Sequence, residues 1–197
     1  MTLSKKSKYL LLSACALSFM TFSSSASAQT ANMTATATVQ NAMTLTTPSQ
    51  LNFGTVAAVR DPAITAFVEV NPAGVESIGG GGGTAVTAII DNAAVSAAQI
   101  TVADAADGAS INIVINNVID PTLAAESFVL DQFTTSWNGA GFVGRTIGTP
   151  FAETFDAATG PNLNTLDIGA RITTTLGAGT AYSDGVYAGS YDVVFSY

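Results

Sequence analysis

The chain has 197 residues, with six basic and fourteen acidic side chains, a formal net charge of −8 at neutral pH and no histidine. An acidic chain cannot neutralise a row of phosphates, so the composition argues against nucleic-acid binding. Hydrophobic residues make up 48% of the chain and charged residues 10%, which predicts a folded protein with a buried core and argues against disorder.

Residues 1–28 have the pattern of a cleaved secretory signal peptide. Three lysines precede a mostly apolar run at residues 9–22, and small residues lead up to Ala28. The apolar run is shorter than the roughly 20 residues that span a bilayer, so cleavage is favoured over a membrane anchor. The mature chain is then expected to start at Gln29, to contain 197 − 28 = 169 residues and to carry no membrane span.

One alternative concerns Cys15, because Leu12-Ser13-Ala14-Cys15 is similar to a lipoprotein cleavage box whose cysteine becomes lipidated. If cleavage instead follows Ala28, the only cysteine and all three lysines are removed. Three arginines then face fourteen acidic residues, a net charge of 3 − 14 = −11. The mature chain forms no internal disulfide, so its stability must come from burial and strand pairing.

The mature chain is patterned as short strands separated by glycine, proline and asparagine. Strands are expected at residues 33–39, 51–56, 63–70, 84–90, 99–103, 111–118, 128–137, 142–147, 164–176 and 185–197. Between strands, Asn138-Gly139 is typical of a hairpin turn. The glycine run 79–83 and residues 150–162 are expected as loops, and residues 93–98 as a short helical turn. About nine short strands with almost no helix predict an all-β sandwich or barrel.

The segment Gly185–Tyr197 is the most regular of these strands. Side chains alternate between the two faces of a strand. One face therefore carries Tyr187, Tyr191, Val193, Phe195 and Tyr197, and the other carries Ser190, Asp192 and Ser196. The pattern predicts a half-buried strand that pairs with earlier parts of the chain, because a lone strand leaves its backbone groups unpaired.

Three segments resemble landmarks of the domain of unknown function 4402 family of secreted bacterial proteins. They are Leu51-Asn52-Phe53-Gly54-Thr55-Val56, Leu166-Asp167-Ile168-Gly169-Ala170, and the ending from Gly189-Ser190-Tyr191 through Val193, Phe195 and Tyr197. The ending is also similar to that of spore-coat-U-type and chaperone–usher pilus subunits, although the spore-coat-U type usually carries cysteines. The resemblance implies an immunoglobulin-like, pilin-like antiparallel β-sandwich over residues 41–197.

The resemblance also implies a mechanism of assembly. Pilus subunits of this kind lack one strand, and a chaperone and then the N-terminal extension of the next subunit fill the gap. Here the implied donor lies within residues 29–40, with Met33, Ala35, Ala37 and Val39 on its apolar face. Tyr191, Val193, Phe195 and Tyr197 would form the acceptor strand. The alternative is that residues 33–39 are simply the first strand of a self-complete sandwich.

Two further alternatives place the aromatic side chains in other roles. A small outer-membrane β-barrel also ends on alternating aromatic residues, but it needs strands of about 9 to 11 residues and aromatic girdles at both interfaces. Most strands expected here are shorter. A carbohydrate-binding module would use Trp137, Tyr182 and Tyr187 for stacking, whereas the simpler expectation is that Trp137 packs at the edge of the core.

Catalysis is not expected. With no histidine, and no cysteine or lysine after cleavage, the mature chain has no residues for Ser-His-Asp, Cys-His or Ser-Lys nucleophile systems or for a His/Cys zinc site. Asp104 with Asp107, and Glu153 with Asp156, could in principle bind calcium or act in acid–base chemistry, but neither pair has a calcium-loop pattern. No cofactor, metal or catalytic residue is therefore assigned.

The sequence thus predicts a secreted structural or adhesive protein, in the periplasm or on the surface of a Gram-negative cell. Its expected partners are copies of itself or a periplasmic chaperone. If it polymerises as pilus subunits do, the contact is expected to be head to tail and open-ended. A monomeric surface- or carbohydrate-binding sandwich is the alternative.

Overall fold

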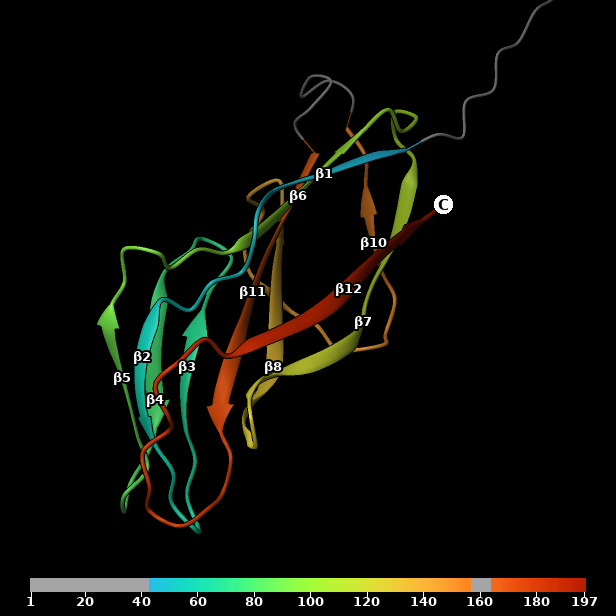
Figure 1. Ribbon diagram of the computed structural model, residues 1–197. Helices are drawn as coiled ribbons and strands as arrows, with labels where there is room; N and C mark the ends of the chain where they lie inside the picture. Colours follow the sequence, from blue (N-terminus) through green and yellow to red (C-terminus); the bar gives the residue numbers. More distant parts are fainter. Residues whose placement is uncertain (1–42, 157–163) are drawn as a thin grey trace, which may run out of the picture. The chain divides into compact units, whose positions relative to one another are not determined.

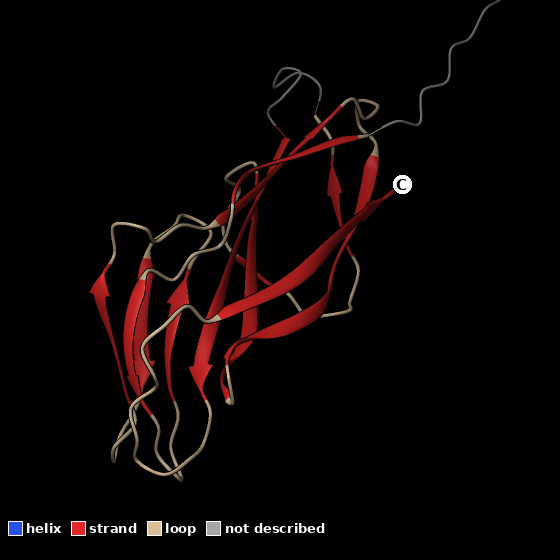
Figure 2. Cartoon of the chain, viewed as in Figure 1, coloured by secondary structure: helices blue, strands red, loops and turns tan. Residues whose placement is uncertain are grey.

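The computed structural model describes residues 43–156 and 164–197, which all belong to one compact unit. Within them the chain forms antiparallel strands and no helix (Figure 2). In chain order the strands are β1 (Thr44–Ser49), β2 (Thr55–Val59), β3 (Ala66–Val70), β4 (Glu76–Gly80), β5 (Val86–Asp91), β6 (Ala98–Ala103), β7 (Ser110–Leu123), β8 (Glu126–Trp137), β9 (Val143–Gly144), β10 (Phe151–Thr154), β11 (Asn164–Thr174) and β12 (Ala188–Ser196).

The first layer of the sandwich is built around β11. Its first half pairs with β6 and its second half with β3, while β8 runs along its other edge. β1 extends the layer beyond β6, β4 beyond β3, and β9 beyond β8. The inward side chains of β11 alternate as the period of a strand requires, and Leu166, Ile168 and Ala170 are fully buried.

The second layer is built around β7, which pairs with β12 on one edge and β10 on the other. In Figure 1, β7 and β12 cross in front of β8 and β11. Ile111, Ile113 and Ile115 project from β7 into the core with at most 1% exposure. A tight turn at Ala124 joins β7 to β8 and links the layers. β2 and β5 form a separate two-stranded sheet whose Val56 and Ile89 pack against the same core.

The structure confirms the all-β, antiparallel sandwich. The turn at Asn138-Gly139 is also confirmed, because both residues have positive φ angles and the amide of Ala140 donates to the carbonyl of Trp137. Trp137 is buried at the edge of the core, where its indole N–H donates to the carbonyl of Thr154 at 3.0 Å.

Three expectations about loops and turns were wrong, and the described part of the chain has twelve strands in place of about nine. The expected glycine loop begins as the end of β4, because the ring of Phe67 on the paired strand covers Gly79 and replaces the missing side chain. The expected loop 150–162 begins as β10, which pairs with the start of β7. In place of a helical turn at residues 93–98, a single turn from Asn92 to Val95 leads into β6.

Asp61 holds the turn between β2 and β3. One carboxylate oxygen accepts the amides of Ala63 and Ile64 at 2.8 and 3.1 Å, and the other accepts the amide and hydroxyl of Thr84, both at 2.8 Å. These bonds, led by the one from the Thr84 amide, lower the pKa of Asp61 to about 2. The charged carboxylate therefore ties this turn to the start of β5.

This carboxylate is expected to contribute to acid sensitivity. Because the folded pKa lies below the unfolded value of about 3.9, the stabilisation is fully present above pH 4 and is lost as pH falls through about 2. Melting temperatures measured from pH 6 to pH 2 should fall less steeply for Asp61→Asn than for the wild type, and the variant should already melt lower at pH 6. Parallel melting curves for the two proteins would contradict this role.

Candidate strand-addition groove

The inward face of β12 is only half covered. Tyr191, Val193 and Phe195 pack against the core but are partly exposed, and they alternate with exposed residues such as Val194. The Tyr191 ring meets Phe133 edge to face at 5.1 Å, and burial raises the pKa of its hydroxyl to about 12. A row of large apolar side chains thus forms part of the core without being closed over.

The backbone of β12 pairs with β7 along one edge. Its register with β7 runs from Ala188 opposite Thr122 to Ser196 opposite Asn112. No strand in residues 43–156 or 164–197 pairs with the other edge of β12. β1 likewise pairs only with β6 within the described residues. Among the residues that the structure describes, each of these two strands therefore has one edge without a paired strand.

β1 and β12 share one end of the domain. β1 begins opposite Ala103 at the end of β6, and β12 ends opposite Asn112 near the start of β7, which follows β6 in the chain. The start of β1 and the end of β12 therefore lie at the same end of the domain, and the strands run in opposite directions in Figure 1. We call the half-covered face of β12 that carries Tyr191, Val193 and Phe195, together with the cavity lined by residues 51–59 and 181–189, the β12 groove, and this end its open end.

The opposite end of the β12 groove is closed by backbone hydrogen bonds. The amide of Arg60 donates to the carbonyl of Thr180, and the amide of Tyr182 donates to the carbonyl of Ala58, both at 3.0 Å. This short pairing joins the end of β2 to the segment that leads into β12. A strand lying in the groove could not continue past this point.

Beside the closed end the groove widens into a cavity of about 910 Å³. Its walls are residues 51–59 and 181–189, and its lining includes the core residues Phe128 and Ile172. Two exposed apolar side chains on its rim, Ile90 and Val186, have exposed fractions of 67% and 83%. The cavity thus combines polar and apolar lining groups and reaches Gly189 at the start of β12.

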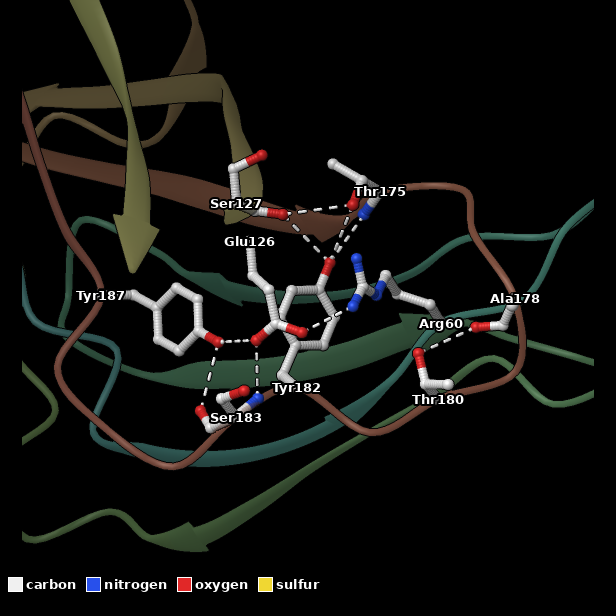
Figure 3. Close-up of polar contacts among 9 residues, drawn as sticks. All are labelled: Arg60, Glu126, Ser127, Thr175, Ala178, Thr180, Tyr182, Ser183 and Tyr187. Carbon is white, nitrogen blue, oxygen red and sulfur yellow. Dashed lines mark hydrogen bonds and ion pairs between the residues drawn. The ribbon is translucent and has the colours of Figure 1, made fainter. Parts of the chain in front are cut away.

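Glu126 holds one wall of this cavity in place (Figure 3). One of its carboxylate oxygens accepts from the guanidinium of Arg60 at 2.6 Å, and the other accepts from the Ser183 amide at 2.7 Å and the Tyr187 hydroxyl at 2.6 Å. The bond from Tyr187, followed by that from Ser183, lowers the pKa of Glu126. Burial, together with the neighbouring carboxylate, raises the pKa of Tyr187 to about 12.

Removing the charge of Glu126 should loosen this wall. Glutamine is neutral, so Glu126→Gln cannot form the ion pair with Arg60. The Ser183 amide should therefore exchange with solvent about tenfold faster or more in hydrogen-exchange measurements. Glu153→Gln breaks the separate ion pair with Arg145 and serves as the matched control. Unchanged exchange at Ser183 in Glu126→Gln, or equal acceleration in both variants, would contradict this role.

Aromatic side chains near the cavity pack against one another and against Arg60. The Tyr182 ring stacks on Phe128 with centroids 4.3 Å apart, and the guanidinium of Arg60 lies over the Tyr182 ring at 5.0 Å. Tyr187 meets Phe128 edge to face, and the Tyr182 hydroxyl donates to the carbonyl of Ser127. Trp137 is bonded to Thr154 in the core, as the simpler expectation had it, so the alternative trio of Trp137, Tyr182 and Tyr187 does not form a stacking surface.

Comparison with protein families then identifies the chain. The model of a family described as a domain of unknown function, DUF4402, matches residues 43–197. The chain belongs to the DUF4402 family. No curated protein and no solved structure matches it. The DUF4402 match begins one residue before β1 and runs through β12, so it covers both sides of the β12 groove.

Within the DUF4402 domain, three of the four predicted acceptor residues lie on β12 and the fourth follows it. Tyr191, Val193 and Phe195 line the groove, whereas Tyr197 follows β12 and is 49% exposed. The predicted donor residues Met33, Ala35, Ala37 and Val39 lie outside the residues that the structure describes.

The sequence analysis did not single out several residues around the cavity of the DUF4402 domain. Glu126 has no motif around it, and its partners are 57 to 66 positions away in the chain. Leu51 and Phe53 had a usable signal, since they belong to the first family landmark, and they line the cavity.

The carboxylate pairs considered from the sequence are Asp104 with Asp107 and Glu153 with Asp156. Glu153 accepts from Arg145 at 2.7 Å. Among the described residues no group of three or more His, Cys, Asp or Glu side chains is placed to hold a metal ion. In the same part of the chain, no helix is long and apolar enough to cross a membrane.

Proposed function

We propose that this protein is a secreted structural or adhesive component of the bacterial surface that assembles by strand addition. Residues 33–39 of one copy would add to the edge of β12 that no described strand pairs with in another copy, after a periplasmic chaperone has occupied the same edge. The unpaired edge of β12, with its half-covered apolar row, carries the proposal. Secretion rests on the signal-peptide pattern of residues 1–28.

The energetics of such an addition are adequate without being large. Burial of Met33 and Val39 contributes roughly 1.5 to 3 kcal/mol each, and each alanine methyl about 0.8, so the face supplies about 5 to 8 kcal/mol before entropy. Each backbone hydrogen bond to β12 adds on the order of 1 kcal/mol. Open strand edges that carry apolar side chains favour pairing with another chain, so an occupant of this edge also protects it.

The proposal is tested by the assembly state of the mature chain. Residues 29–197 and residues 41–197, both produced in the periplasm, are compared by light scattering and negative-stain microscopy. The longer protein should form strand-exchanged assemblies, and the shorter one should remain a folded monomer. A monomer from residues 29–197 at every concentration would overturn the proposal.

A further inference from the structure

We infer that the added strand runs parallel to β12, with Met33 in the cavity at the closed end of the β12 groove. This inference rests on the proposed strand addition and gives it a direction. At the closed end, the bonds from Arg60 to Thr180 and from Tyr182 to Ala58 block the path of a continuing chain. A strand can stop there only near its free end, and after signal cleavage only residues 29–32 precede Met33.

The side-chain sizes fit the same direction. Met33 is the largest apolar residue in residues 29–42, and its flexible thioether side chain suits the apolar part of an irregular recess, here Phe128 and Ile172 in the cavity of about 910 Å³. Ala35 and Ala37 occupy the middle of the segment and would lie beside Tyr191 and Val193 in either direction, so the size of Met33 carries this argument.

The lengths also agree. Met33 and Val39 are six residues apart, as are Gly189 beside the cavity and Phe195 near the open end. Six steps of an extended strand span about 20 Å. With Met33 in the cavity, Val39 therefore reaches the end of β12 and leaves the groove where no described strand blocks it.

This direction determines the kind of assembly. From Val39 to Thr44 the chain spans at most about 18 Å. Thr44 begins β1, which lies at the open end of the donor's own groove. The two copies therefore meet open end to open end, and each places its strand next to the other's groove. Such a contact is two-fold and closed, so the strands are exchanged reciprocally within a pair and no filament grows.

Engineered disulfides test the direction, because the mature chain has no cysteine of its own. In residues 29–197, Met33→Cys is combined with Val56→Cys, which lines the cavity, or with Leu45→Cys on the inward face of β1 at the open end. Ala57→Cys, an exposed cavity position, replaces Val56→Cys if that variant is unstable. Oxidised proteins are analysed on non-reducing gels, and the mass of the unmodified protein is measured by light scattering.

The expected result is a covalent dimer from Met33→Cys with Val56→Cys, little product from Met33→Cys with Leu45→Cys, and a dimer mass for the unmodified protein. Efficient cross-linking of the Leu45 pair into a ladder would reverse the direction and overturn this inference while leaving strand addition intact. Assemblies without a cross-link in either pair would also overturn it. A disulfide confined to one chain would overturn both the exchanged pair and the proposed function.

Discussion

Replacing Gly169 by alanine is expected to prevent the domain from folding stably. Gly169 lies in β11 where its partner changes from β6 to β3. A Cβ atom there would overlap the carbonyl oxygen of Val70 and lie 2.6 Å from the carbonyl carbon of Asn71. Both neighbours are backbone atoms, so the clash can be relieved only by moving β3 away from β11. A loss of more than about 4 kcal/mol is expected, comparable to the largest single-residue effects.

Gly144→Ala provides the matched control for this variant. Gly144 also lies in a strand of the same layer, but a Cβ atom there would meet no other atom within 4 Å. Urea unfolding followed by circular dichroism should give a near-normal transition for Gly144→Ala and none, or a strongly shifted one, for Gly169→Ala. Equal transitions for the two variants would show that β3 and β11 are not packed as closely as described.

A charge in the apolar row of β12 is expected to abolish assembly without unfolding the domain. Val193 faces the β12 groove and is half-buried, so a glutamate there can still reach water in an isolated domain. Once an added strand covers the groove, the carboxylate would be buried without a partner, at a cost of several kcal/mol. Val193→Glu should therefore weaken association by at least about 100-fold, as a cost of about 2.7 kcal/mol would.

The neighbouring residue supplies the control. Val194 lies on the opposite face of the same strand and is 47% exposed, so Val194→Glu adds the same charge outside the groove. Sedimentation of residues 29–197 carrying either substitution should show monomers for Val193→Glu and wild-type assemblies for Val194→Glu. If both variants assemble normally, the groove face of β12 does not contact the added strand.

Much of the fold could be predicted because strand period is a local property. The alternation in residues 188–196 gave the inward face of β12 correctly, and the Asn138-Gly139 turn followed from the ease with which these residues adopt positive φ angles. The same reasoning was wrong at Gly79, because its strand depends on the Phe67 ring of the preceding strand, which pairs with it. A missing side chain indicates a loop only when no neighbour fills its place.

The groove itself could not be predicted from the pattern. Alternation shows which side chains point inward, but it does not show whether another strand covers them, and the row on β12 is only half covered. The closed end depends on bonds between residues 58–60 and residues 180–182, which are more than 100 positions apart. Glu126 likewise joins distant segments, so only the three-dimensional arrangement reveals it.

Titration of a peptide comprising residues 29–40 into the domain of residues 41–197 tests the central claim most directly. Fluorescence anisotropy of the labelled peptide should show saturable binding, and backbone amides on the open edge of β12 should exchange more slowly in the complex. Binding should be lost in Val193→Glu and kept in Val194→Glu. A folded, monomeric domain that does not bind the peptide would contradict strand addition at the β12 groove.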